Sequence, residues 1–202
     1  MTKNRGVFCL EGHWYGDHRD TTSVYPILDL VHRFHKMPFI HHKCSTIEEF
    51  EFSIKRWKTK SFHNKYPILY LAFHGDRGKL LIGKDNISLY ELANLLQGKC
   101  RGVVIYFGSC ATLDIHGRII NNFLKRTGAI AALGYTKDVE WLISSAFDVL
   151  LMNELQMELL DSIGIRKIYA TIIKEYKSLC QRIDFRMVIN KHDKFVRKRK
   201  IV

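Results

Sequence analysis

Three short runs of almost wholly apolar residues constrain the fold of this 202-residue chain more than any other feature. They read "YPILYLAF" at 66–73, "GVVIYF" at 102–107 and "AIAALGY" at 129–135. Each run has the length of a strand, and its apolar residues do not alternate with polar ones. Such runs are typical of strands that are buried on both faces of a parallel sheet, and a sheet of this kind needs helices on both sides.

Segments with helical periodicity separate the strand-like runs. Capping boxes at Ser45/Glu48 or Thr46/Glu49, and at Ser88/Glu91, predict two helix starts, and Gly128 predicts a helix end. Two more helices are expected at about 139–159 and 166–181. The apolar faces expected in the other helices are Val24, Ile27, Leu28, Val31 and Phe34; Ile47, Phe50, Ile54 and Trp57; Leu89, Leu92, Leu95 and Leu96; and Ile119, Ile120, Phe123 and Leu124.

Further strands are expected at 5–11, 38–44 and 184–189, and a small hairpin at 78–88 with Asp85 and Asn86 in its turn. The alternation of strands and helices predicts an α/β fold, a three-layer sandwich with a mostly parallel central sheet flanked by helices. No repeat or linker-like segment interrupts the pattern. We therefore expect one domain over 1–202 with a basic tail at about 191–202.

Composition narrows the partners and the cellular setting. The net charge is +12, with clusters at "KRWKTKSFHNK" and "NKHDKFVRKRKIV", which we interpret as a solvated face and a basic terminus. Nucleic acid is a partner that we favour less, because no RNA-recognition or helix-turn-helix motif occurs. Five cysteines at irregular spacing, without a signal peptide or an 18-residue apolar run, predict a cytoplasmic protein without a membrane partner.

A histidine-rich segment resembles a metal site but lacks its spacing. It holds His32, His35, His41, His42 and Cys44. No pair of ligands has the spacing of a tetrahedral zinc site. We expect no metal and no cofactor. Of the other cysteines, Cys9 and Cys180 are predicted in the core and Cys100 in an exposed turn.

One histidine and one cysteine follow the two most apolar runs. His74 follows "YLAF", and Cys110 follows "YFGS". The carboxyl ends of parallel strands meet at one edge of a sheet, where the ligand sites of α/β folds lie. A cysteine attacks as its thiolate and needs an adjacent base, and His74 supplies one. The N–H groups of Gly75 and of Cys110, which precedes a helix, are candidates to stabilise an oxyanion.

The segments "YLAFHGDRGKLLIGKDNISLYELANLL" and "GVVIYFGSCAT" resemble the caspase-like cysteine peptidases, most closely their bacterial CHAT-type branch. In that family a strand ends in His-Gly, a hairpin and a helix follow, and the next strand precedes the nucleophilic cysteine. The resemblance spans about 66–155. It implies that His74 is the general base and acid, that Cys110 is the nucleophile, and that Gly75 and Cys110 form the oxyanion hole.

The substrate pocket is less well defined than the dyad. Caspases carry Gln two positions before the cysteine, and arginine- and lysine-directed relatives carry Asp there, whereas this chain has Gly108. The strand ending in Tyr135 and the loop after it are expected to bind an extended peptide. Glu11, Asp138 and Glu140 lie on neighbouring loops, and an acid at the base of the pocket would select a basic P1 residue. Otherwise we expect a small or apolar P1 residue, or broad cleavage.

These observations predict a cytoplasmic cysteine endopeptidase acting on a protein or peptide substrate. By resemblance it is a bacterial antiviral-defence or cell-suicide effector, activated by a regulatory partner protein or a small molecule. The first alternative is a catalytically silent caspase-like module that uses its basic surface to bind nucleic acid or an acidic protein. The second is a cysteine-dependent transferase or amidase acting on a non-peptide acyl group.

Overall fold

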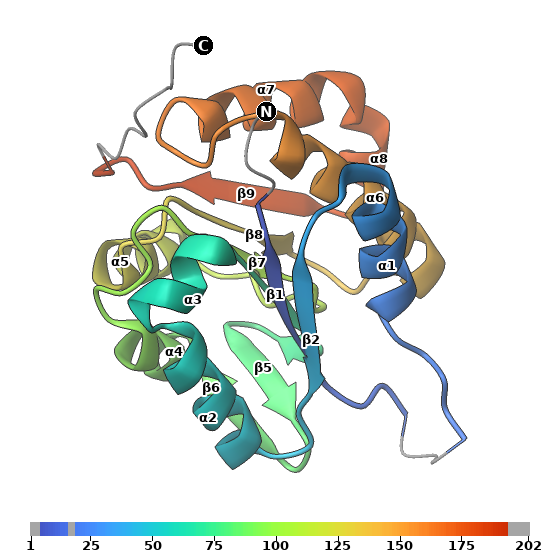
Figure 1. Cartoon of the computed structure of the whole chain (residues 1–202), viewed down its shortest axis with the longest axis vertical. Coiled ribbons are helices and arrows are strands. Elements are labelled where there is room, and N and C mark those ends of the chain that lie inside the picture. Colours follow the sequence, from blue (N-terminus) through green and yellow to red (C-terminus); the bar gives the residue numbers. More distant parts are fainter. Residues whose placement is uncertain (1–4, 16–18, 194–202) are drawn as a thin grey trace.

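A six-stranded sheet forms the centre of the computed structural model, which describes residues 5–15 and 19–193 (Figure 1). The strand order is β2-β1-β3-β7-β8-β9, and only β9 runs antiparallel to its neighbour. The strands are β1 (Val7–Glu11), β2 (Phe39–Lys43), β3 (Ile68–Ala72), β7 (Val104–Phe107), β8 (Ala131–Tyr135) and β9 (Phe185–Ile189). The mostly parallel sheet predicted from the three apolar runs is confirmed.

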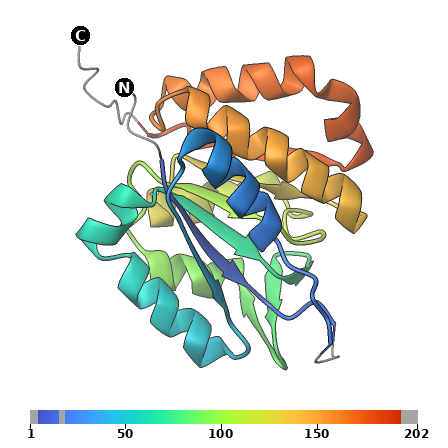
Figure 2. The ribbon, with the colours of Figure 1, turned by 45° about the vertical axis from the view of Figure 1, so that its right-hand side comes forward.

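Helices cover both faces of this sheet, which makes a three-layer sandwich (Figure 2). One face is covered by α2 (Ile47–Trp57), α3 (Lys60–Lys65), α4 (Leu89–Leu96) and α5 (Gly117–Thr127). The other is covered by α1 (Tyr25–His35), α6 (Trp141–Met157), α7 (Gly164–Glu175) and α8 (Lys177–Arg182). Alternate residues of each strand enter the two cores: Leu69 and Leu71 face the first, Ile68 and Tyr70 the second.

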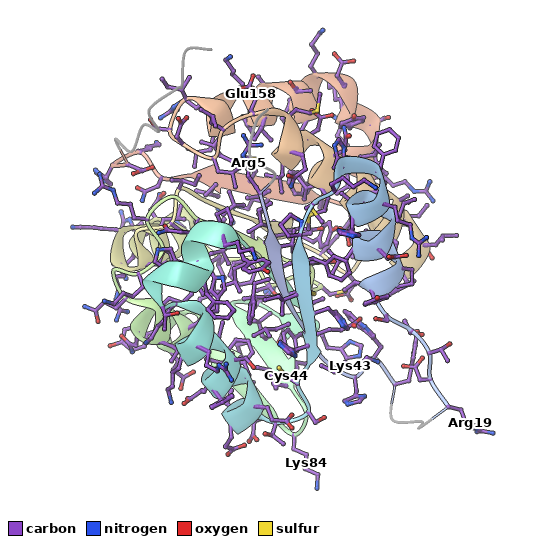
Figure 3. All side chains as sticks on the ribbon, in the orientation of Figure 1. Arg5, Arg19, Lys43, Cys44, Lys84 and Glu158 are labelled. Carbon is purple, nitrogen blue, oxygen red and sulfur yellow. The ribbon has the colours of Figure 1, made fainter. Side chains whose placement is uncertain are left out.

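A second, antiparallel sheet lies at the carboxyl ends of the parallel strands (Figure 2). It consists of β4 (His74–Asp76), β5 (Lys79–Ile82) and β6 (Asp85–Ser88). Figure 3 labels Lys43 and Cys44 at this end of the molecule and Arg5 at the opposite end, where the parallel strands begin. The candidate catalytic residues therefore lie where the small sheet meets the edge of the large one.

Local sequence signals set several element boundaries. Thr46 and Glu49 form the capping box of α2, and Ser88 and Glu91 form that of α4. Gly128 ends α5 with φ of 78°, in the left-handed region that glycine adopts without strain. Of the two boxes proposed for α2, the structure uses the second.

Several expectations are wrong in detail. The β5–β6 turn lies at Gly83 and Lys84, because Gly83 has φ of 60°, and Asp85 and Asn86 begin β6. The helix expected at 166–181 breaks into α7 and α8 at Tyr176. Phe34 is 82% exposed and Cys100 is fully buried, since the first faces away from the sheet and the second packs in the core beneath α4.

Residues 194–202 of the expected basic tail, and residues 16–18 of the loop after β1, lie outside the described residues. Within the described part of the chain, no helix combines the length and the apolar character needed to cross a membrane.

Candidate active site

Cys110 lies in a tight turn that follows β7. Two backbone hydrogen bonds to the segment 135–137 hold the turn in place. The Ala111 N–H donates to Lys137 O and the Leu113 N–H donates to Tyr135 O, both at 3.0 Å. Ala111 has φ of 49°, an uncommon conformation for a residue with a side chain. Of the chain's five cysteines, Cys110 alone is partly exposed. The fold therefore presents this thiol to solvent from a fixed and conformationally strained turn.

The helix that follows Cys110 starts later than expected. Helix α5 begins only at Gly117, and its N-cap is His116, whose Nδ1 accepts from the Arg118 N–H at 3.2 Å. The expectation that the helix dipole acts at the N–H of Cys110 is therefore wrong, because that effect is confined to the first turn of a helix.

His74 is the first residue of β4 and not the last residue of β3. Its side chain is exposed, and its ring packs edge-on against the indole of Trp14 with the centroids 5.3 Å apart. Its Nε2 lies 2.7 Å from the carbonyl oxygen of Trp14. Because a carbonyl oxygen can only accept, Nε2 carries a proton, and Nδ1 is left to accept one. No sequence pattern indicated this partner, which lies 60 residues away.

Gly75 brings the histidine segment against the cysteine turn. A Cβ atom placed on Gly75 would lie 2.5 Å from the carbonyl oxygen of Cys110 and 2.9 Å from Cβ of Ser109. No side chain fits in that space, so the backbone of β4 contacts the turn directly. Ser109 and Thr112 reinforce the turn through a 2.7 Å bond between their hydroxyls. His74 and Cys110 are thus on adjoining segments, although 36 residues separate them in sequence.

A cavity of ≈ 40 Å³ adjoins Cys110. Four of its lining residues are aromatic: Trp14, Tyr70, Tyr135 and Trp141. The indoles of Trp14 and Trp141 meet edge to face with their centroids 4.5 Å apart. Gly108 also lines the cavity, as does Asp148 of α6. Two residues that the sequence suggested for the pocket, Gly108 and Tyr135, therefore lie beside Cys110.

Asp148 was not anticipated from the sequence. Its carboxylate accepts from the phenol of Tyr70 at 2.6 Å, from that of Tyr135 at 3.1 Å and from that of Tyr106. The hydroxyls of Tyr106 and Tyr135 also lie 2.5 Å apart. Burial raises the pKa of Asp148 to about 6, although the three phenols partly oppose that change. Its sequence signal is that it is the one charged residue in the apolar segment "WLISSAFDVLLMN", which is typical of a buried acid.

Glu11 does not line the cavity. It is fully buried and accepts four hydrogen bonds, from Trp14 Nε1 and Ser23 Oγ at 2.6 Å, from the Val24 N–H at 2.8 Å and from His41 Nε2 at 2.6 Å. Burial alone would raise the pKa of Glu11, but these bonds outweigh it and lower the pKa. Glu11 anchors the loop that carries Trp14, which corrects the expectation that it contacts substrate.

The other two candidate acids also lie outside the cavity lining. Glu140 is the N-cap of α6, and its carboxylate accepts from the backbone N–H groups of Leu142 and Ile143, each at 3.0 Å. Asp138 is exposed on the loop before it. The cavity's acid comes instead from the interior of the same helix.

The histidine-rich segment is divided among separate contacts. His32 Nδ1 lies 2.7 Å from Met37 O, His35 Nε2 lies 2.8 Å from Asn153 Oδ1, and His41 bonds to Glu11. Cys44 is buried, and burial raises its pKa to about 11. Among the residues that the structure describes, no three His, Cys, Asp or Glu side chains are grouped so that they could hold a metal ion.

Comparison with protein families matches residues 4–189 to DUF6642, a family of unknown function. The chain belongs to this family. Comparison with curated proteins found no matching sequence. The DUF6642 chain therefore has to be interpreted from its own geometry.

Proposed function

We propose that this DUF6642 protein is a cysteine endopeptidase in which Cys110 is the nucleophile and His74 moves the proton. The observation that carries the proposal is the contact of Gly75 with the Cys110 turn, which brings the segment that begins at His74 against the turn of the chain's one partly exposed thiol. The Trp14 carbonyl supports it further, because it fixes the imidazole with Nδ1 free to act as a base.

The proposed reaction follows from these positions. Nδ1 of His74 accepts the thiol proton, and the Cys110 thiolate attacks the peptide carbonyl carbon. The N–H groups of Gly75 and Cys110 stabilise the oxyanion of the tetrahedral intermediate. The imidazolium then protonates the leaving amine as the C–N bond breaks. Water, activated by His74, hydrolyses the acyl-enzyme and restores the thiol.

We further propose that the protein acts in the cytoplasm and is regulated by a partner protein or a small molecule. The hydrogen bond between His74 and the Trp14 carbonyl depends on the position of Trp14 in the loop after β1. Glu11 fixes this position by accepting hydrogen bonds from Trp14 and Val24. A ligand that shifts Trp14 would switch His74 on or off. A role in antiviral defence or cell suicide rests on the resemblance to bacterial caspase-like enzymes.

Cysteine alkylation tests the dyad without a known substrate. We expect iodoacetamide to modify Cys110 at about pH 6.5 at least about tenfold faster in the wild type than in His74→Ala, because a histidine-paired thiolate persists where a free thiol is protonated. Mass spectrometry of each cysteine gives the rates, and buried Cys9, Cys44, Cys100 and Cys180 serve as internal references.

His63→Ala is the matched control, since His63 lies on α3 and its Nδ1 is 3.3 Å from the carbonyl oxygen of Lys58 at the end of α2. Equal Cys110 rates in the wild type and His74→Ala would overturn the dyad and favour the non-enzymatic binding module.

A further inference from the structure

We propose that the cavity beside Cys110 recognises the ammonium group of a lysine side chain, with Asp148 at its base as the specificity-determining residue. The inference rests on the proposed peptidase activity and names its P1 residue. Asp148 and Cys110 line the same cavity. The substrate side chain that enters this cavity is therefore that of the P1 residue, whose carbonyl carbon the thiolate attacks. Asp148 is 4% exposed, and it lines this cavity.

Among the described residues, the negative charge of Asp148 has no ion-pair partner. Its partners are three neutral phenols, and within the described ranges no Lys, Arg or His forms an ion pair with it. A buried charge without a counter-charge is expensive. Its raised pKa reflects that cost. A bound cation would remove the cost, which gives the cavity a preference for positively charged ligands.

The hydrogen-bonding capacity of Asp148 leaves room for such a ligand. An ionised carboxylate offers about four acceptor positions. Of the described residues, Tyr106 and Tyr135 donate to Oδ1, and Tyr70 is the one that donates to Oδ2. One position on Oδ2 therefore remains for a donor that enters from the cavity.

The walls suit a cation with an apolar stem. Trp14, Trp141 and Tyr70 present aromatic rings, which attract cations through their π faces. Val24 and Val139 add apolar surface to the lining. An aliphatic chain would pack against these side chains and deliver its charged end to Asp148.

The size of the cavity favours lysine over arginine. The cavity is small, at ≈ 40 Å³. The ammonium end of lysine is compact and carries its charge on a slender stem. The planar guanidinium of arginine is broader and must displace one of the aromatic walls.

Gly108 is explained by the same arrangement. A Cβ atom at this position would overlap Cε2 of Tyr70 and lie 3.0 Å from the tyrosine hydroxyl. Any side chain here would displace Tyr70 from Asp148. The absence of an acid two positions before Cys110 therefore does not argue against a basic P1 residue, because α6 supplies the carboxylate.

Peptidyl chloromethyl ketones test the inference on the full-length wild type. The Cys110 thiolate displaces chloride and forms a C–S bond, and the P1 side chain sets how well the reagent is bound. Four reagents share one peptide and differ only in a P1 residue of lysine, norleucine, arginine or aspartate. Norleucine has the carbon skeleton of lysine with hydrogen in place of the ammonium group. We expect the lysine reagent to react at least about tenfold faster than the norleucine reagent, which is about 1.4 kcal/mol.

Each rate is divided by the iodoacetamide rate of the same sample, which separates recognition from the reactivity of the dyad. We expect Asp148→Asn to reduce the lysine-to-norleucine ratio to about one. Glu154→Gln removes a carboxylate from the same helix outside the cavity, where it bonds to Tyr176, and should keep the ratio of the wild type.

A norleucine reagent as fast as the lysine reagent would overturn the inference, and an aspartate reagent faster than both would do so as well. Arginine faster than lysine would overturn the argument from size. Iodoacetamide labelling that depends on His74, with no reaction of any ketone, would refute lysine recognition while the dyad stands. Failure of iodoacetamide labelling as well would refute both proposals. If Asp148→Asn does not fold, the wild-type reagent series still decides.

Discussion

Glu11 and Asp148 are both buried carboxylates on the α1/α6 side of the sheet, yet their surroundings act on them in opposite directions. Glu11 accepts from an indole, a hydroxyl, a backbone N–H and an imidazole, and its pKa is lowered. Asp148 accepts from three phenols, and its pKa is raised to about 6. Burial penalises the charge in both cases, so the donors decide the outcome.

The difference separates a structural acid from an acid available to a ligand. The donors of Glu11 come from the loop after β1 and from β2, so its charge ties these segments together. The donors of Asp148 come from three neighbouring strands that the sheet already holds in place. Its charge is not needed to join them and remains incompletely compensated at the base of a cavity.

Loss of the Glu11 charge is expected to have the largest effect on stability. Glu11→Gln should lower the free energy of unfolding at pH 7 by about 3–5 kcal/mol, because buried donors lose their anionic partner. Since the native pKa of Glu11 lies below its ordinary value near 4.5, the wild type keeps this stabilisation above that value and loses it as the pH falls further. Urea unfolding at several pH values measures both effects.

Glu51→Gln provides the control, because Glu51 forms an exposed pair with Lys55 and should contribute less than about 1 kcal/mol. A Glu11→Gln effect no larger than this would show that the Glu11 network is not an anchor.

The pH dependence of Asp148 should have the opposite sign. Its native pKa of about 6 exceeds the ordinary value of 3.8, so the native state retains a proton that the unfolded state releases. The stability of the wild type should therefore fall by about 3 kcal/mol, relative to Asp148→Asn, as the pH rises from about 3 to about 8. Unfolding curves of the two proteins across this range test the difference, and parallel pH profiles would contradict the raised pKa.

Removal of one phenol should have the smallest effect of the three. Tyr70→Phe should cost about 1–3 kcal/mol at pH 7, because Asp148 loses the sole donor to Oδ2. It should also raise the pKa of Asp148 further, so the loss shrinks below about pH 5, where the carboxyl is neutral. Tyr90→Phe on the exposed surface of α4 is the control, expected within about 0.5 kcal/mol of the wild type. Equal costs for the two tyrosines would argue against a charged Asp148.

The sequence predicted the secondary structure well where local chemistry decides it. Thr46 and Ser88 begin their helices through capping boxes, and Gly128 ends α5, because each of these signals acts within one turn. It failed at Gly83, where a left-handed glycine outweighed the turn preference of Asp85 and Asn86. It also failed at Phe34, because periodicity gives the width of an apolar face but not what covers it.

The candidate site divides in the same way. The apolar runs before His74 and Cys110 predicted that both residues lie at the carboxyl edge of one sheet, and they do, because strands of this kind are buried in parallel sheets. Tertiary structure alone decided the partners of the site. It places the Trp14 carbonyl against His74, Glu11 outside the cavity lining and Asp148 within it. Hydrogen bonds and cavity linings formed by separate elements depend on the packing of those elements, and no local pattern encodes that packing.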